Sequence, residues 1–128
     1  MDLPVDCIEL FLPFKAEYVS VARLTASGIA NRMGFDIEAI EDIKVAVSEV
    51  CSKLVRMGSR IADGYRIIFK IGKLSLNIVY DCEDKSLKCI FNNDTDELAM
   101  PIIKSLMTSV ELCSNNSYIL SMSKDVEE

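Results

Sequence analysis

In this 128-residue sequence, Glu49 and Lys53 are the pair whose residue types and spacing most directly suggest a chemical function. They lie four positions apart in a segment of helical periodicity, so both side chains share one face of a helix. One interpretation is an exposed ion pair, extended by the nearby Arg56 and worth about 0.2–0.5 kcal/mol. The alternative is a functional site in which the carboxylate and the ammonium face a bound group. Both interpretations predict that Glu49 is ionised.

Metal-binding and disulfide motifs are absent from the sequence. It contains no histidine, and its five cysteines are odd in number and widely scattered, without a Cys-x-x-Cys pair. A zinc site needs such a cluster of ligands. We therefore expect no such metal site, and we interpret the thiols as reduced, mostly buried hydrophobic side chains. They are Cys7, Cys51, Cys82, Cys89 and Cys113.

The composition predicts one compact domain that avoids polyanions. Half of the residues are apolar, which is enough to bury a core. The 14 basic and 20 acidic residues give a net charge of −6, which repels phosphate backbones and anionic lipid. We therefore expect neither nucleic acid nor a membrane surface as a direct partner.

The sequence shows no signal for export or membrane insertion. Residues 1–6 lack a basic region, and every apolar run is far shorter than the roughly 20 residues that span a bilayer. The protein is expected in the cytoplasm. We expect a single domain over residues 1–128, with an acidic tail at residues 123–128.

The first half is predicted to form one strand and two helices. Alternating apolar residues predict a strand over residues 7–14, with Pro13 marking its end. From residue 15 a helical pattern predicts the first helix, and Gly34 occupies the position of a left-handed cap. Its inward residues are expected to be Tyr18, Val21, Ala22, Thr25, Ile29 and Met33. Asp36 is expected to cap a second helix that ends at Gly58. Its inner stripe comprises Ile40, Ile43, Val47, Val50 and Leu54.

The middle of the chain is predicted to form a β-hairpin. Two alternating apolar runs, residues 65–71 and 74–80, are separated by Gly72-Lys73, a pair suited to a two-residue turn. The two strands should therefore be antiparallel neighbours.

The last third is predicted to contain a helix between two short strands. Residues 87–91 are interpreted as a strand and residues 92–96 as a polar turn. A third helix fits residues 98–110, with Pro101 in its first turn, where the missing amide proton costs little. A last strand is expected at residues 118–122.

These elements predict an α+β fold. Strands interleaved with three amphipathic helices, including one hairpin, favour a mixed, mostly antiparallel sheet that is covered on one face by the helices. The predicted architecture is a two-layer α/β sandwich.

Two segments carry a resemblance to a known family. Residues 17–30, EYVSVARLTASGIA, and residues 40–51, IEDIKVAVSEVC, resemble the anti-sigma-factor serine-protein kinases of bacteria. Those kinases belong to the GHKL ATPase superfamily, which also contains gyrase, histidine kinases and MutL. The resemblance covers nearly the whole chain in order and is weaker after Asp81. It implies the histidine-kinase-like ATPase fold, with ATP and Mg²⁺ as cofactors.

The resemblance assigns a catalytic position to Glu49. In the family, the second helix carries a Glu that acts as a base and, four residues later, an Asn that helps to hold magnesium. Glu49 matches the first position, but Lys53 stands at the second. An ammonium has no lone pair to give to a metal. Lys53 would instead neutralise Glu49 or touch a phosphate directly.

The resemblance also assigns the remaining nucleotide-binding positions. The family motif Asp-x-Gly-x-Gly, whose Asp reads adenine, corresponds to residues 81–85, where Asp81 is present and Glu83 and Lys85 replace the glycines. By the residue alone, Asp81 is equally well interpreted as a turn-forming side chain. A glycine-rich turn that holds phosphate corresponds to residues 97–100, where Glu97 and Ala99 replace the glycines. The predicted nucleotide-binding residues are Lys53, Asp81, Glu83, Lys85 and Ala99.

The distribution of glycine predicts a degenerate ATP site. All five glycines lie at or before Gly72, whereas in this family the later half of the chain grips the phosphates. A backbone without glycine rarely adopts the conformations of phosphate-binding nests. The resemblance therefore implies an ATP site that is weak or lost, and a kinase fold that is inactive.

The preferred hypothesis is a regulator that docks, as a homodimer, onto a sigma factor or an anti-sigma antagonist. Arg23 matches a family arginine implicated in gripping these partners; the alternative is a solvated basic residue. Two rival hypotheses stay open. One is an active serine-protein kinase that phosphorylates the antagonist with Glu49 as base, and the other is a scaffold or oligomerisation module in signalling.

Overall fold

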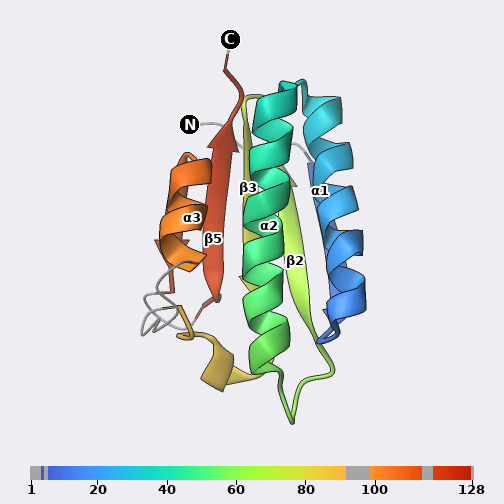
Figure 1. The fold of residues 1–128 in the computed structure, drawn as a ribbon, viewed down its shortest axis with the longest axis vertical. Helices are drawn as coiled ribbons and strands as arrows, with labels where there is room; N and C mark the ends of the chain where they lie inside the picture. Colours follow the sequence, from blue (N-terminus) through green and yellow to red (C-terminus); the bar gives the residue numbers. More distant parts are fainter. Residues whose placement is uncertain (1–3, 5, 92–98, 114–116, 128) are drawn as a thin grey trace.

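The computed structural model describes residues 4, 6–91, 99–113 and 117–127. Its elements follow one another as a strand, two long helices, a hairpin, a short helix and two final strands (Figure 1). The strands are β1 (Asp6–Pro13), β2 (Gly64–Ile71), β3 (Ser75–Asp81), β4 (Ser109–Leu112) and β5 (Leu120–Asp125). The helices are η1 (Ala16–Tyr18), α1 (Val19–Met33), α2 (Ile37–Met57), η2 (Lys85–Leu87) and α3 (Ala99–Leu106).

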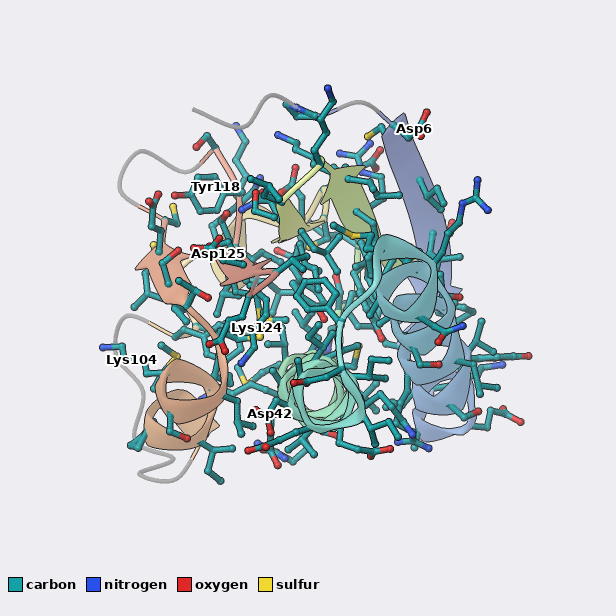
Figure 2. The ribbon with its side chains drawn as sticks, turned by 90° about the horizontal axis from the view of Figure 1, so that it is seen from above. Asp6, Asp42, Lys104, Tyr118, Lys124 and Asp125 are labelled. Atoms are coloured by element: carbon teal, nitrogen blue, oxygen red, sulfur yellow. The ribbon has the colours of Figure 1, made fainter. Side chains whose placement is uncertain are left out.

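The five strands form one sheet in the order β1-β2-β3-β5-β4. Every pairing between the described strands is antiparallel. Helices α1, α2 and α3 lie on one side of this sheet, so the molecule has two layers (Figure 2). The predicted α+β sandwich with a mostly antiparallel sheet and three covering helices is confirmed.

The core lies between the helices and the inner face of the sheet. Alternate residues of β2 and β3 are fully buried against α2, as the period-2 pattern predicts. They are Tyr65, Ile67, Phe69, Leu76, Ile78 and Tyr80. In α2 the predicted stripe is buried at Ile43, Val47, Val50 and Leu54.

Both long helices end as the sequence indicates. Gly34 has a φ of 92° and its N–H donates to the carbonyls of Ala30 and Asn31, which caps α1. The Asp36 carboxylate accepts a hydrogen bond of 2.8 Å from the Ala39 N–H and caps α2. These two caps set the tight turn that places α1 antiparallel to α2.

The inward face of α1 differs in part from the prediction. Ala22 and Ile29 are buried as predicted, and Ala26 and Ala30 are buried as well, whereas Tyr18 and Val21, which were expected to point inward, are exposed. Small side chains let α1 approach α2 closely, so the alanines take the contact face. The chain also enters α1 through η1, because the Tyr18 N–H donates to the Lys15 carbonyl, three residues back, at 3.1 Å.

The predicted hairpin is confirmed, with its tip shifted by one residue. The Gly72 N–H donates to the Ser75 carbonyl at 2.9 Å, so Gly72 pairs with Ser75, and Lys73 and Leu74 form the turn. The expected turn pair was Gly72-Lys73.

The predicted strand at residues 87–91 is wrong. The Asp84 carboxylate accepts from the Ser86 N–H at 3.0 Å and starts η2, which bends the chain into successive turns up to Phe91. Leu87 and Phe91 are buried, but Cys89, which a strand would place on the same face, is exposed, and Lys88 between them is buried.

The later elements are displaced from their predicted bounds. Helix α3 ends at Leu106, because the Thr108 N–H donates to the Ser123 carbonyl at 2.9 Å and residues 109–112 join the sheet as β4. Strand β5 continues through residues 123–125, which were assigned to the acidic tail. The polar turn at residues 92–96, together with Glu97, lies outside the described residues.

Lys124 joins several elements at one end of the molecule. Its ammonium lies 3.5 Å from the Asp42 carboxylate of α2 and also donates to the Leu106 carbonyl of α3 (Figure 2). This contact ties two helices to β5. None of the helices in the described part of the chain combines the length and apolar character needed to cross a membrane.

Candidate functional site

The predicted nucleotide-binding residues lie on elements that meet at the lower end of the molecule in Figure 1. This end is formed by the C-terminal half of α2, the end of β3, the η2 turn and the start of α3. It is opposite the end at which Lys124 contacts α2 and α3.

Lys53 is a buried cation. Only 7% of its surface is exposed, and its Nζ lies 5.4 Å from the centre of the Phe91 ring. This distance allows a cation–π interaction, which strengthens when both partners are desolvated. The burial excludes the interpretation of Lys53 as part of an exposed ion-pair ladder. Glu49, one turn earlier, is half-buried and forms no ion pair with Lys53 among the described residues.

Asp81 is held by three donors of the chain itself. Its carboxylate accepts from the Lys88 ammonium, from the Arg66 guanidinium at 3.4 Å and from the Cys82 N–H at 2.9 Å. Arg66 in turn lies 3.8 Å from the Glu9 carboxylate. The side chains of Asp81 and Lys88 are 17% and 10% exposed, so their ion pair is largely desolvated.

The sheet places Asp81 away from Glu49 and Lys53. Tyr80 points inward toward α2, so Asp81, the next residue of β3, lies on the opposite face of the sheet. Its cross-strand partner is Arg66, which shares this open face. Glu49 and Lys53 therefore lie one turn apart on α2, on the other side of the sheet from Asp81.

Asp84 organises the turn that follows β3. Its carboxylate accepts hydrogen bonds from the Ser59 hydroxyl, the Ser86 hydroxyl and the Ser86 N–H, at 2.6, 2.6 and 3.0 Å. The Ser59 hydrogen bond, followed by those from Ser86, lowers the pKa of Asp84 below its ordinary value. The turn is thus tied to the loop after α2. Glu83 and Lys85 lie on this turn and are exposed.

The start of α3 is packed into the core. Ala99 and Met100 are buried, together with Cys82 and Lys53. Pro101 is exposed. Lys53, Cys82 and Met100 are therefore packed within the protein, whereas Pro101 is not.

A cavity of about 270 Å³ opens beside the turn after β3. Its lining includes Arg66, Cys82 and Glu83, and it also contains Asp63 and the Phe11 ring. Neither Glu49 nor Lys53 lines it.

A thiol and two phenols lie buried beneath α2. The Cys51 Sγ lies 3.9 Å from the Tyr80 hydroxyl, which donates to the Val47 carbonyl at 3.4 Å. Burial is the main cause that raises the pKa of Cys51 to about 11, and burial likewise raises the pKa of both Tyr65 and Tyr80. These groups stay neutral at physiological pH and act as core residues.

Arg23 links the two long helices. Its guanidinium donates to the Ser48 hydroxyl at 3.1 Å, and Ser48 donates to the Lys44 carbonyl at 2.8 Å. Arg23 is half-buried, so it is more than a solvated basic residue. Its predicted role in partner binding stays a prediction.

The described residues contain no group of three or more Cys, Asp or Glu side chains arranged to hold a metal ion. A magnesium site built from Glu49 would therefore need ligands from the nucleotide or from outside the described ranges.

Several residues of this end were not singled out by the sequence analysis. Lys88, Phe91, Arg66 and Ser59 become neighbours of the predicted residues only through tertiary contacts. Asp84 had a local signal, because an Asp two residues before a Ser is typical of a side-chain-capped turn.

The family follows from comparison with known proteins. Residues 12–124 match the family described as the histidine kinase-like ATPase domain. The serine-protein kinase RsbW of Bacillus pumilus (strain SAFR-032) is 33% identical over 97% of this chain and 88% of its own length. The RsbW kinases of Bacillus thuringiensis (strain Al Hakam) and Bacillus cereus (strain AH820) are each 30% identical over 94% of this chain and 85% of their own length. All three alignments are longer than the chain, so these kinases carry residues that it lacks. The chain therefore belongs to the histidine kinase-like ATPase domain family, in the group of the RsbW serine-protein kinases.

Proposed function

We propose that this chain is an anti-sigma-factor-like regulatory protein that acts by docking onto a sigma factor or an anti-sigma antagonist, and that its ATP site is weak or lost. The partners come from its kinship with the RsbW kinases. The proposal of a weak ATP site is supported chiefly by the ion pairs that Asp81 forms with residues of the chain itself.

Asp81 is already engaged at the position expected to read adenine. Its carboxylate holds Lys88 and Arg66, and it faces the side of the sheet opposite Lys53. An adenine amino group would have to displace a charged partner, leaving Lys88 buried without a counterion. The residues present therefore do not fit the adenine.

Lys53 does not fit the magnesium. It stands where the family resemblance expects an asparagine ligand, and its ammonium is buried against Phe91. An ammonium cannot coordinate a metal, and a second cation brought next to it would be repelled. No phosphoryl-transfer step is therefore derived for this chain.

Calorimetry with ATP and Mg²⁺ tests the proposal. We expect a Kd weaker than about 100 μM, which corresponds to roughly 5.5 kcal/mol, while RsbW of Bacillus pumilus serves as the reference kinase. Lys53→Asn alone should not restore binding, because Asp81 stays engaged. Tight binding by the unaltered chain would overturn the proposal. Restoration by Lys53→Asn alone would show that Lys53 is the only obstacle.

The second candidate function is an active serine-protein kinase. Glu49 is half-buried on α2, and no described residue forms an ion pair with it, so its carboxylate is available as a base. The RsbW relatives, which bear the name of serine-protein kinases, favour the same role.

Phosphate transfer from labelled ATP to a serine of an antagonist domain separates the two functions. An active kinase should label the antagonist, and Glu49→Gln should reduce the rate by about 100-fold or more. Glu41→Gln, on an exposed part of the same helix, is the matched control and should leave the rate unchanged. The docking proposal predicts no labelling above background for any of these proteins.

Arg23 is the residue proposed to contact the docked partner. Arg23→Ala should weaken capture of the sigma factor or antagonist by about tenfold or more, since interface arginines often contribute strongly. Arg32→Ala removes the same charge from the end of α1 and is the matched control. Ser48→Ala, which removes the hydrogen-bond partner, tests whether Arg23 must be held in place. Equal binding by Arg23→Ala and the unaltered chain would remove Arg23 from the interface.

A homodimer is part of the same proposal. Strand β1 lies at the edge of the sheet and exposes Ile8 and Phe11, the latter to 59%. Edge strands with exposed apolar side chains are prone to pair with another chain. Sedimentation at micromolar concentration should give the mass of two chains, and Phe11→Lys should shift it toward one. A single-chain mass at all concentrations would reject the dimer.

A further inference from the structure

The cavity of about 270 Å³ beside the turn after β3 has an aromatic ring in its wall. Leu10 and Leu12 of β1 pack against the core, so Phe11 between them points to the face of the sheet that the helices leave uncovered. Phe11 is 59% exposed. The cavity therefore lies on the open face of the sheet, at the end of the molecule that is lower in Figure 1.

The Phe11 ring is supported by the backbone of β2. A Cβ at Gly64 would lie only 2.9 Å from the Cε2 atom of this ring. The missing side chain of Gly64 therefore lets the ring pack against β2, while more than half of the Phe11 side chain stays accessible. The ring is thus a fixed aromatic platform beside the cavity.

Two carboxylates without a counterion share the cavity with this ring. Asp63 and Glu83 line it and are exposed, and neither forms an ion pair with any residue that the structure describes. Arg66 is the cation of the lining, but the Asp81 and Glu9 carboxylates already lie 3.4 and 3.8 Å from its guanidinium. The lining is therefore suited to a further cation.

One hydrogen-bond network positions both carboxylate-bearing segments. The Ser59 hydroxyl donates to the Asp84 carboxylate at 2.6 Å and accepts from the Ala62 N–H at 3.0 Å. Asp63 directly follows Ala62, and Glu83 directly precedes Asp84. The loop before β2 and the turn after β3 are thus tied together, which fixes the two carboxylate positions relative to each other.

We propose that this cavity binds an arginine side chain of a protein partner, with the guanidinium stacked on Phe11 and hydrogen-bonded to Asp63 and Glu83. A guanidinium is planar, stacks on aromatic rings, and carries five N–H donors that match carboxylates. The net charge of −6 attracts a basic segment toward the chain. The proposal goes beyond the docking function, because Arg23 lies in the helical layer on the other side of the sheet.

NMR titration of the isotope-labelled chain with the peptide acetyl-Gly-Arg-Gly-amide tests the site. We expect saturable shifts at the amides of residues 62–64 and 82–84, with a Kd of about 1–10 mM. The same peptide with citrulline in place of arginine has the same shape without the charge and should bind about tenfold more weakly. The lysine peptide should bind about threefold more weakly, because an ammonium neither stacks nor forms a bidentate contact.

Variants separate this cavity from the general acidity of the chain. Asp63→Asn combined with Glu83→Gln should weaken binding of the arginine peptide by about tenfold or more. Glu38→Gln combined with Glu41→Gln removes the same charge at the start of α2, at the opposite end of the molecule, and should change the Kd by less than about twofold. Phe11→Leu keeps an apolar side chain but removes the ring, and should weaken binding by about threefold.

Three results would overturn the proposal: no saturable shifts, equal binding of the arginine and citrulline peptides, or equal weakening by the two double variants. All four substituted carboxylates are exposed, so their amide counterparts should not prevent folding. Asp63 and Glu83 lie outside β1, so the outcome does not depend on the proposed dimer. Arg23→Ala should leave peptide binding unchanged, which makes failure here distinguishable from failure of the docking proposal.

Discussion

Asp81 and Lys88 form a largely desolvated ion pair, so each residue depends on the other. Lys88 is buried, and its ammonium has the Asp81 carboxylate as its described counterion. Removing one member of such a pair leaves the other charge without compensation.

We predict that Asp81→Asn lowers the free energy of unfolding by about 2–4 kcal/mol. Arg66→Gln also removes a partner of Asp81, but Arg66 is 42% exposed, so we expect a loss within about 1 kcal/mol. Urea denaturation of both variants provides the measurement. Equal losses would show that Lys88 is not the partner that matters.

Through Asp84, the stability that the turn after β3 contributes to the fold depends on pH. Its pKa in the folded protein is lowered, first by the Ser59 hydrogen bond and then by those of Ser86. A carboxyl with a lowered pKa stabilises the fold above its ordinary pKa, here 3.8, and loses this contribution as the pH falls through the folded value.

The stability gap between the unaltered chain and Asp84→Asn should therefore be constant above about pH 5 and narrow below about pH 4. Ser59→Ala should reduce the gap, because it removes the main cause of the lowered pKa. Urea midpoints measured from pH 7 to pH 3 test this. A gap that widens on acidification would contradict the assignment.

At the scale of elements, the β1–β2 pairing depends on a close approach at Gly64. A Cβ at this position would lie 2.3 Å from the Leu12 carbonyl oxygen of β1, too close for any side chain. Apart from its chain neighbours and the backbone of its own helix, Gly28, in the middle of α1, has no atom within 4 Å of the same position.

The two glycines should respond in opposite ways to the same substitution. Gly64→Ala should destabilise the protein by about 2 kcal/mol or more, because backbone must shift to relieve the clash. Gly28→Ala should stabilise it by about 0.5–1 kcal/mol, because alanine favours a helix interior. Thermal unfolding of both variants tests the pair. A destabilised Gly28→Ala would indicate that this face of α1 contacts something outside the described residues.

At the scale of the whole molecule, one core joins both layers. Buried residues from α1, α2, α3 and the sheet form a single cluster. Helix α3 contributes Ile103, which is fully buried, although this helix has only eight residues.

We therefore expect one cooperative unfolding transition and a global effect of changes in α3. Ile103→Ala should lower the free energy of unfolding by about 2–5 kcal/mol. Ile61→Ala, at a site that is 77% exposed, should change it by less than about 0.5 kcal/mol. Circular dichroism and tyrosine fluorescence should report the same midpoint. Separate midpoints would show that α3 unfolds on its own.

Sequence alone determined the two-layer α+β class, the central hairpin and the two long helices with their caps. These features depend on local patterns: alternating apolar residues in β2 and β3, a helical stripe in α2, and Asp36 and Gly34 at the helix ends. Local energetics act through neighbours in the chain, so they can be inferred without the fold.

The tertiary structure determined which residues contact one another at the candidate site. The partners of Asp81 come from β2 and from the turn after η2, and the ring over Lys53 comes from Phe91, 38 positions later in the chain. Contacts between distant segments depend on how the layers pack, which no local pattern encodes.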